Sequence, residues 1–294
     1  MRYRIKLSYS GAGFCGWQVQ PDAPSVQQTL QAALSTLLRV PEVSVTGAGR
    51  TDTGVNAIGY IAHFDAAEGL DTRQLCYKLN AILPRSVVIH DIAPAAPDFH
   101  ARFDATEREY IYFLHRCKDP FADGYSYLYT FPDVDFEAMN RAAQALPGRH
   151  DFRCFEKTGA DSKTSLCTVR EAGWHRYTPT HLSLTGRDGG DDYWYFRISA
   201  DRFLRNMVRA VVGTLLEVGR CKRSVEDFAA LVLPADYTEE GSPGSGAREP
   251  DCDGNHPAIP LEGTQGVTGR LPAGRSRAGE SVPGHALFLS GVCY

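Results

Sequence analysis

Residues 43–64, VSVTGAGRTDTGVNAIGYIAHF, contain two apolar runs with a glycine-rich loop between them. The runs at 43–46 and 58–64 are short and rich in β-branched or aromatic residues, as is typical of strands. Three glycines interrupt the pattern and predict a loop, which also carries Arg50 and Asp52. The stretch therefore predicts two strands whose connecting loop presents a cation and a carboxylate.

Strand and helix signals alternate around this stretch. Residues 3–9 alternate polar and apolar side chains, which predicts a strand. The capping-box sequence from Ser25 to Gln28 predicts a helix that ends at Pro41. Because strands alternate with helices and several strands follow one another directly, the pattern is α+β. The same criteria predict helices at 71–82, from Asp135 to Pro147, at 201–218 and from Ser224, and strands at 87–92, 109–115, 169–176, 181–185, 193–199 and 286–294.

The chain divides into two similar α+β halves, which we expect at 1–105 and 106–294. Within the second half, residues 236–268 hold six glycines, four prolines, seven acids and one base. Such a segment buries too little apolar surface to offset its ordering entropy, so we predict a disordered acidic insert. Its net charge of −6, taken from the total of −4, leaves +2 for the rest of the chain, which is compatible with a basic, phosphate-binding face.

Composition and spacing exclude several classes of protein. No apolar run approaches the roughly 20 residues that span a bilayer, and the N-terminal residues lack the apolar core of a signal peptide. We therefore expect a cytoplasmic protein with no membrane partner. The nine histidines show no metal-ligand spacing, which predicts that no metal is bound.

The loop at 47–55, GAGRTDTGV, supports three interpretations. It could be a hairpin turn in which Asp52 caps the backbone, because glycine and aspartate favour such turns. It could cradle a phosphate, although the lysine and hydroxyl of a P-loop do not follow. In the third interpretation Asp52 is a nucleophile, since carboxylates form covalent intermediates with sugars and related electrophiles.

Two further clusters carry functional hypotheses. If 201–218 is one helix, then Arg202, Arg205 and Arg209 share a face with Asn206, either as a solvated stripe or as partners of a carboxylate or phosphate. Tyr110 lies on one face of the strand predicted at 109–115, together with Tyr112. These tyrosines either expose their hydroxyls or offer a ring on which a flat base stacks.

The loop sequence GAGRTDTGV closely resembles the catalytic motif of the tRNA pseudouridine synthase A family. Other blocks follow in the order of that family and cover nearly the whole chain outside 236–268. They are FCGWQ at 14–18, LNAILP at 79–84, HARF at 100–103, REYIY at 108–112, HDF at 150–152, SKT at 162–164, FLRNMVR at 203–209 and the ending from 281 to 289.

The resemblance implies an isomerase that converts uridine to pseudouridine at positions 38, 39 and 40 of the anticodon stem-loop of tRNA. It also implies a homodimer that uses no cofactor and no metal. The implied structure is the pseudouridine synthase fold, an α+β fold with a central, mostly antiparallel sheet built from two ferredoxin-like halves and an active-site cleft between them.

The resemblance also assigns roles to individual residues. Asp52 would be the nucleophile that attacks C1′ of the sugar or C6 of the base, and Arg209 would pair with it and aim it. Tyr110 would stack on the uracil near the C5 proton. For the substrate, Arg50 would contact phosphate and help to flip the nucleotide, as chemistry on a stacked base requires. Leu287 would form part of the apolar floor under the base, and Arg205 would join Arg50, Arg102, Arg108 and Arg202 on an RNA-binding face.

Some positions depart from the family pattern. Asn56 stands where histidine is expected, Thr53 where alanine is common, and a glycine shift alters residues 284–286. The insert at 236–268 has no family counterpart that the motifs reveal. Two rival functions remain: a non-catalytic protein that binds structured RNA with the same face, and an aspartate-nucleophile hydrolase or phosphotransferase. The second rival usually needs Mg²⁺ and a second carboxylate, which the loop lacks.

Overall fold

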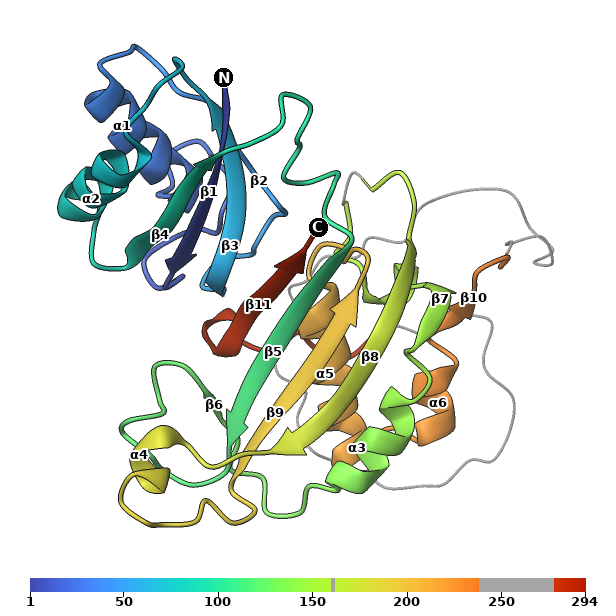
Figure 1. Ribbon diagram of the computed structural model, residues 1–294. Helices are drawn as coiled ribbons and strands as arrows, with labels where there is room; N and C mark the ends of the chain where they lie inside the picture. The colour runs from blue at the N-terminus through green and yellow to red at the C-terminus, as the bar shows by residue number, and fades with distance from the viewer. Residues whose placement is uncertain (160–161, 238–277) are drawn as a thin grey trace.

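The computed structural model describes residues 1–159, 162–237 and 278–294. In these residues the strands form one eleven-stranded sheet in the order β10-β7-β8-β9-β5-β11-β3-β1-β4, with β2 paired to β3 and β6 to β5. Figure 1 shows this sheet running through the molecule. The strands are β1 (Arg2–Tyr9), β2 (Val45–Gly47), β3 (Asn56–Asp65), β4 (Val87–Pro94), β5 (Glu107–His115), β6 (Tyr127–Leu128), β7 (Gly148–Asp151), β8 (Leu166–Arg176), β9 (Tyr193–Ala200), β10 (Leu233–Pro234) and β11 (Leu287–Cys293).

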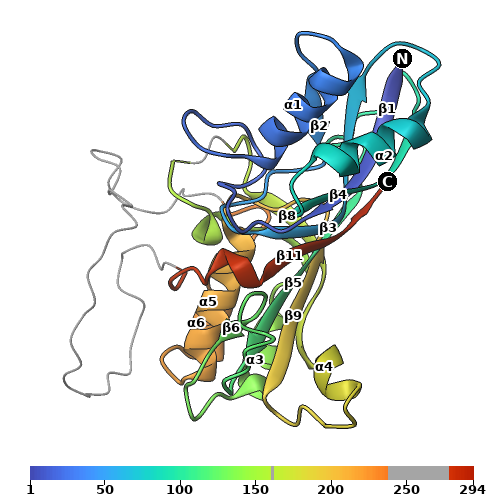
Figure 2. The same ribbon diagram turned by 90° about the vertical axis from the view of Figure 1, so that its left-hand side faces the viewer.

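The helices lie over both ends of the sheet. Near β1 and β4 lie two helices, whereas three others cover one face of the β5, β8 and β9 end (Figures 1 and 2). The helices are α1 (Val26–Leu38), α2 (Thr72–Ile82), α3 (Phe136–Ala143), α4 (Thr180–Ser183), α5 (Met207–Gly219) and α6 (Val225–Ala229), with 3₁₀ turns η1 (Arg153–Phe155) and η2 (Gly284–Ala286).

Nearly all strand pairs are antiparallel, the exceptions in the described chain being β11 with β3 and β5 with β6. The prediction of an α+β fold around a mostly antiparallel sheet is therefore confirmed. The strands β1 to β4 gather at one end, β5 to β10 at the other, and β11 lies between β3 and β5. The division into halves at 105/106 stays a prediction, and the insert predicted at 236–268 falls, from residue 238 onward, outside the described residues.

Local capping signals place most helix starts correctly. The hydroxyl of Ser25 accepts from the backbone N–H of Gln28, as the capping box predicts. Asp71, Asp135 and Ser224 cap α2, α3 and α6 in the same way. The end of α1 differs slightly from expectation, because a left-handed residue at 39 ends the helix before Pro41.

Two of the predicted elements are wrong. Residues 181–185 were expected as a strand, but Thr180–Ser183 form the short helix α4. The helix predicted at 201–218 begins only at Met207, because Asn206 adopts a left-handed φ of 66° that breaks a continuous helix. Phe203, in the non-helical segment before α5, packs on Tyr110, with ring centroids 5.1 Å apart.

Helix α5 is the most deeply buried helix beside the β5, β8 and β9 end of the sheet. All of its thirteen residues except Arg209 and Glu217 are buried. Full burial of one Leu or Val side chain stabilises a fold by about 1.5–3 kcal/mol, so packing fixes this helix firmly on the sheet. A charged side chain carried by so buried a helix is held in a defined place, which makes Arg209 suitable for positioning another group.

Candidate active site

The loop that carries Asp52 connects β2 to β3 and is supported by close backbone contacts. The N–H of Val55 bonds to the carbonyl of Asp52 at 3.2 Å, which closes a tight turn around the carboxylate. Gly16, at a φ of 90°, approaches so closely that a Cβ there would lie 2.3 Å from the carbonyl oxygen of Thr51. The glycine is therefore required for the first loop of the chain to reach the second.

Three aromatic rings lie beneath this loop. The rings of Trp17 and Tyr60 are 4.3 Å apart, and Tyr9 packs against both. The Tyr60 hydroxyl accepts from the N–H of Gly49 at 3.2 Å, and the Tyr9 hydroxyl bonds to the Thr51 hydroxyl at 2.9 Å. These buried bonds anchor both sides of the loop. Sequence reasoning missed Tyr9 and Tyr60, since nothing in their local pattern distinguishes them from core tyrosines.

Asp52, in the loop between β2 and β3, and Arg209, on α5, lie close together. The Nη1 atom of Arg209 lies 3.9 Å from Oδ2 of Asp52, an ion-pair distance that is too long for a hydrogen bond. Both side chains are about a quarter exposed, at 29% for Asp52 and 23% for Arg209. Within the described chain no group donates a hydrogen bond to the Asp52 carboxylate, so both of its oxygens are available to a bound molecule.

Arg209 is itself fixed by the segment before β11. Its Nε donates to the carbonyl of Val282 at 2.6 Å, and the N–H of Val282 donates back to the carbonyl of Arg209 at 3.3 Å. The guanidinium therefore faces Asp52 without being held by it. Val282 is a second contributor that the sequence did not reveal, because it acts through its backbone carbonyl.

Asn56 joins three segments at the base of the loop. Its Oδ1 accepts from the N–H of Gly11 at 2.9 Å, and its Nδ2 donates to the carbonyl of His285 at 2.7 Å. The side chain is buried. A Cβ at the neighbouring Gly284 would lie 2.4 Å from the carbonyl oxygen of Thr53, so the C-terminal segment lies directly on the loop that carries Asp52.

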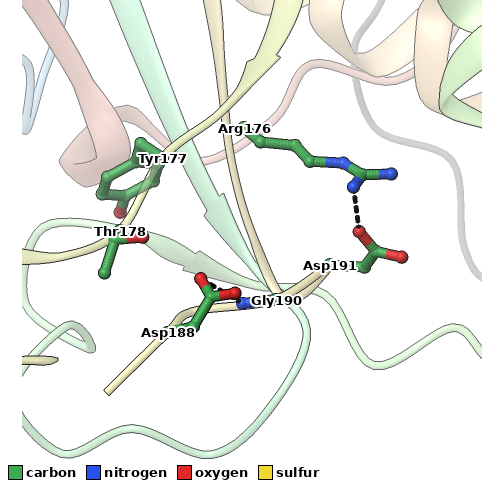
Figure 3. A pocket seen from close by; sticks show the side chains of 6 residues that line it. All are labelled: Arg176, Tyr177, Thr178, Asp188, Gly190 and Asp191. Atoms are coloured by element: carbon green, nitrogen blue, oxygen red, sulfur yellow. Dashed lines mark hydrogen bonds and ion pairs between the residues drawn. The ribbon is translucent and has the colours of Figure 1, made fainter. Parts of the chain in front are cut away.

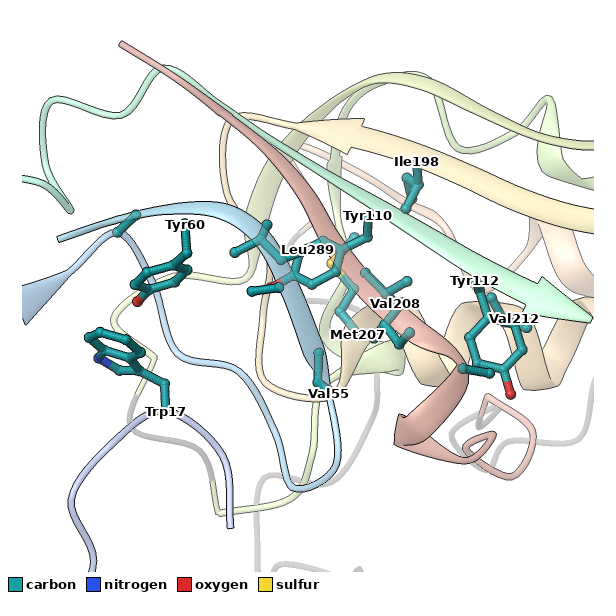
Figure 4. Packing of buried hydrophobic residues seen from close by; sticks show 14 of the residues in the cluster. Trp17, Val55, Tyr60, Tyr110, Tyr112, Ile198, Met207, Val208, Val212 and Leu289 are labelled. Carbon is teal, nitrogen blue, oxygen red and sulfur yellow. The ribbon is translucent and has the colours of Figure 1, made fainter. Parts of the chain in front are cut away.

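Tyr110 points into the apolar side of this region. Figure 4 shows its ring beside Leu289 and near Met207 and Val208 of α5. The tyrosine is largely buried, so packing holds its ring in place. Burial, and secondarily the negative charge of Asp52, raises the pKa of the Tyr110 hydroxyl well above its ordinary value. The hydroxyl therefore keeps its proton at neutral pH.

The C-terminal strand supplies the neighbours of Tyr110. Leu289 of β11 lies opposite Tyr110 of β5, whereas Leu287 lies opposite Tyr112. Both leucines are buried. The structure therefore brings Leu287 to the expected strand, two residues along the register from the partner of Tyr110, and adds Leu289 as the direct neighbour of that tyrosine.

The predicted arginines occupy different environments. Arg50 and Arg205 are exposed, as residues that contact phosphate should be. Arg202 and Arg205 precede α5, so they do not share a helix face with Arg209. Arg108 was expected on the RNA-binding face, but its guanidinium bonds to the carbonyls of four residues, which are Ala48, Arg102, Ala105 and Asp201. Arg108 therefore joins the loop that carries Asp52 to its neighbours rather than facing solvent.

A surface groove occurs at the end of the β8–β9 hairpin, away from this loop (Figure 3). There Arg176 pairs with Asp191 at 2.6 Å, and Asp188 accepts from the N–H of Gly190 at 3.2 Å. Each of these charged side chains already has a partner within the groove. The groove contains no residue that the sequence predicted to be functional. Its lining is Arg176, Tyr177, Thr178, Asp188, Gly190 and Asp191.

The described residues contain no metal cluster and no membrane-spanning helix. Within residues 1–159, 162–237 and 278–294, His, Cys, Asp and Glu nowhere form a group of three or more that could hold a metal ion. The helices of those residues are also too short or too polar to cross a membrane.

The structure brings together Asp52, Arg209 and Tyr110, the three residues that the sequence resemblance assigns to one site. Comparison with known proteins supports that resemblance: a family model described as tRNA pseudouridine synthase matches residues 142–246. The chain is 42% identical over 295 residues to tRNA pseudouridine synthase A of Porphyromonas gingivalis, covering 100% of this chain and 97% of that protein. It is 45% identical over 293 residues to the protein of the same name in Bacteroides thetaiotaomicron, covering 100% of this chain and 90% of that protein. The chain belongs to the tRNA pseudouridine synthase A family, and it is an isomerase.

Proposed function

We propose that the protein isomerises uridine to pseudouridine at positions 38, 39 and 40 of the anticodon stem-loop of tRNA, with Asp52 as the nucleophile. The observation that carries the proposal is the Asp52 carboxylate, which is unbonded within the described chain, 3.9 Å from Arg209 and close enough to Tyr110 for its charge to act on the hydroxyl. RNA binding alone would not require an anion beside phosphates.

The chemistry requires that one bond breaks and another forms at the same sugar. Asp52 attacks C1′ of the ribose or C6 of the base, and the bond between C1′ and N1 breaks. The uracil rotates and C5 bonds to C1′. The bond between the Asp52 oxygen and C1′ or C6 breaks, which returns the carboxylate, while the C5 proton leaves and N1 gains a proton. No oxidant, reductant or metal is needed to balance this isomerisation, so we propose that the enzyme works without a cofactor.

Each neighbouring residue has a role in this proposal. Arg209, fixed by the Val282 carbonyl, aims the carboxylate. Tyr110 contacts the uracil ring, and its protonated hydroxyl can pass on a proton but does not act as a phenolate. Leu287 forms part of the apolar floor. The exposed Arg50 and Arg205 contact phosphates while the nucleotide leaves its stack.

The test replaces Asp52 by an amide of the same shape. Asp52→Asn is expected to abolish tritium release from [5-³H]uridine-labelled tRNA while leaving the tRNA dissociation constant and the melting temperature close to those of the wild type. Added chelator is expected to leave wild-type turnover unchanged. Substantial turnover by Asp52→Asn would contradict the nucleophile assignment, and a wild type that binds tRNA without turnover would support the non-catalytic alternative.

The homodimer forms part of the same proposal, and the sheet face opposite α5 supports it. On that face the ring of Phe113 lies 6.3 Å from that of Tyr195 and 5.5 Å from that of Phe288. Charges of both signs adjoin the rings, including the pair of Arg197 with Glu109. A face that carries both charges suits an identical copy better than RNA, which would favour cations alone.

Sedimentation velocity tests the dimer. The wild type is expected to sediment as a dimer and Tyr195→Arg as a monomer with an unchanged far-UV spectrum. A wild type that sediments as a monomer at micromolar concentration would contradict this part of the proposal. Because its substrate is tRNA, we also propose that the protein acts in the cytoplasm.

A further inference from the structure

The side chain of Phe103 is a large apolar ring that is not buried in the hydrophobic core. It lies in the segment between β4 and β5, and its side chain is 74% exposed. A single exposed apolar side chain is ordinary on a protein surface. Phe103 differs because its backbone and ring are fixed, and because its segment is tied to the catalytic loop.

The backbone around Phe103 is held by a network of short-range bonds. The Nδ1 atom of His100 accepts from the N–H of Arg102 at 3.2 Å and from that of Phe103 at 3.3 Å. The carboxylate of Asp104 accepts from the N–H of His100 at 2.8 Å. The imidazole then stacks on the Phe103 ring, with centroids 4.2 Å apart and planes 29° apart. A ring held in this way loses little conformational freedom when a ligand binds to it.

The same segment is joined to the catalytic loop through one side chain. The Nη2 atom of Arg108 donates to the carbonyl of Ala48 at 2.9 Å and to the carbonyl of Arg102 at 2.6 Å. Ala48 begins the loop that carries Asp52, and Arg102 directly precedes Phe103. The exposed ring is therefore held at a fixed place relative to the nucleophile.

A cation adjoins the ring. The guanidinium carbon of Arg102 lies 5.8 Å from the centre of the Phe103 ring, and Arg50 is exposed on the loop that Arg108 joins to this segment. An aromatic face beside guanidinium groups is the combination that binds an unstacked nucleobase and its phosphate. A purely apolar protein partner would not require the arginines.

We infer that Phe103 is a stacking platform for an unpaired nucleobase of the RNA substrate, other than the uridine that reacts at Asp52. This inference rests on the proposed function and adds a second base contact to it. Arg102 contacts the adjoining phosphate. Because the reacting nucleotide must leave its stack, a neighbouring base loses a stacking partner, and the Phe103 ring replaces it.

The experiment compares three variants on an unmodified tRNA transcript. Phe103→Ala removes the ring, Phe103→Trp keeps an aromatic face, and Tyr77→Ala removes a similarly exposed ring, 76% accessible, from α2. Stacking of one base on one ring contributes about 1–3 kcal/mol to binding. Phe103→Ala is therefore expected to raise the dissociation constant for tRNA by about 5- to 150-fold. Phe103→Trp and Tyr77→Ala are expected to stay within about twofold of the wild type.

A second readout separates stacking from charge and from folding. The slope of log Kd against log salt is expected to be unchanged in Phe103→Ala but smaller in magnitude by about 0.7–0.9 in Arg102→Ala, since only the latter loses a phosphate contact. Unchanged tRNA affinity of Phe103→Ala would overturn the inference, and so would an equal loss in Phe103→Trp or a conversion of Phe103→Ala to monomer. If the wild type did not bind tRNA at all, the proposed function itself would fail.

Discussion

Asn56 offers the sharpest test of how the catalytic loop is held. Asn56→Ala leaves two backbone groups without partners, the buried N–H of Gly11 and the half-buried carbonyl of His285. Each orphaned group costs about 1–3 kcal/mol, so the substitution is expected to lower the free energy of unfolding by about 2–6 kcal/mol. Because these bonds hold the Asp52 loop against the first loop and the C-terminal segment, kcat is expected to fall as well.

Urea denaturation and steady-state kinetics measure the two effects, and Asn80 supplies a control. The Asn80 side chain also makes two bonds to one backbone, at 2.8 Å to the N–H and 2.8 Å to the carbonyl of Ile89. Asn80 is exposed and lies in α2, so Asn80→Ala is expected to reduce stability less and to leave kcat unchanged. If Asn56→Ala had the same free energy of unfolding and the same kcat as the wild type, this account of the loop would be refuted.

Four further outcomes are expected. Gly284→Ala places a Cβ 2.4 Å from the Thr53 carbonyl oxygen and should reduce stability by about 1–3 kcal/mol together with kcat, whereas Gly291→Ala, whose Cβ would meet its nearest atom at 3.6 Å, should be nearly neutral in the same assays. Tyr110→Phe should bind tRNA with wild-type affinity yet turn over more slowly; full activity would show that the hydroxyl moves no proton. Burial opposes ionisation of Asp119, but hydrogen bonds from the Phe121 N–H, the Tyr193 hydroxyl and His181 lower the pKa of its carboxyl overall. The ionised carboxylate therefore stabilises the fold above its ordinary pKa of about 3.9, and this stabilisation is lost as the pH falls through the lower pKa of the folded state. Asp119→Asn should melt at a lower temperature than the wild type at pH 7, and the difference should shrink below about pH 4. The tRNA dissociation constant should depend on salt with a log–log slope of roughly 3–6 in magnitude, and a flat dependence would remove the proposed RNA-binding face.

Local signals in the sequence predict local structure well in this chain. The residues Ser25, Asp71, Asp135 and Ser224 begin helices because each cap involves only the next three residues. The helix start expected at residue 201 fails for a non-local reason. The Asp201 carboxylate accepts from the N–H of Thr168 at 2.8 Å in β8, which holds that part of the chain to the sheet.

The candidate site shows the same limit. Asp52 and Arg209 are named through resemblance to a family, and the sequence pattern alone left the loop open to three interpretations. Arg108 was expected to bind RNA, but its guanidinium binds backbone carbonyls instead. Those carbonyls come from separate segments of the chain, so no local sequence pattern could reveal them. Asn56 stood out as a departure from a motif, but only the fold shows that one side chain joins two distant backbones.

The position of β11 has a consequence for how the chain acquires its fold during synthesis. β3 and β5 are both made well before the strand that lies between them. Until β11 emerges, each of them presents an open strand edge, and such edges pair readily with other chains. The growing polypeptide therefore passes through a long interval of aggregation risk, in which a chaperone that covers strand edges would protect it most.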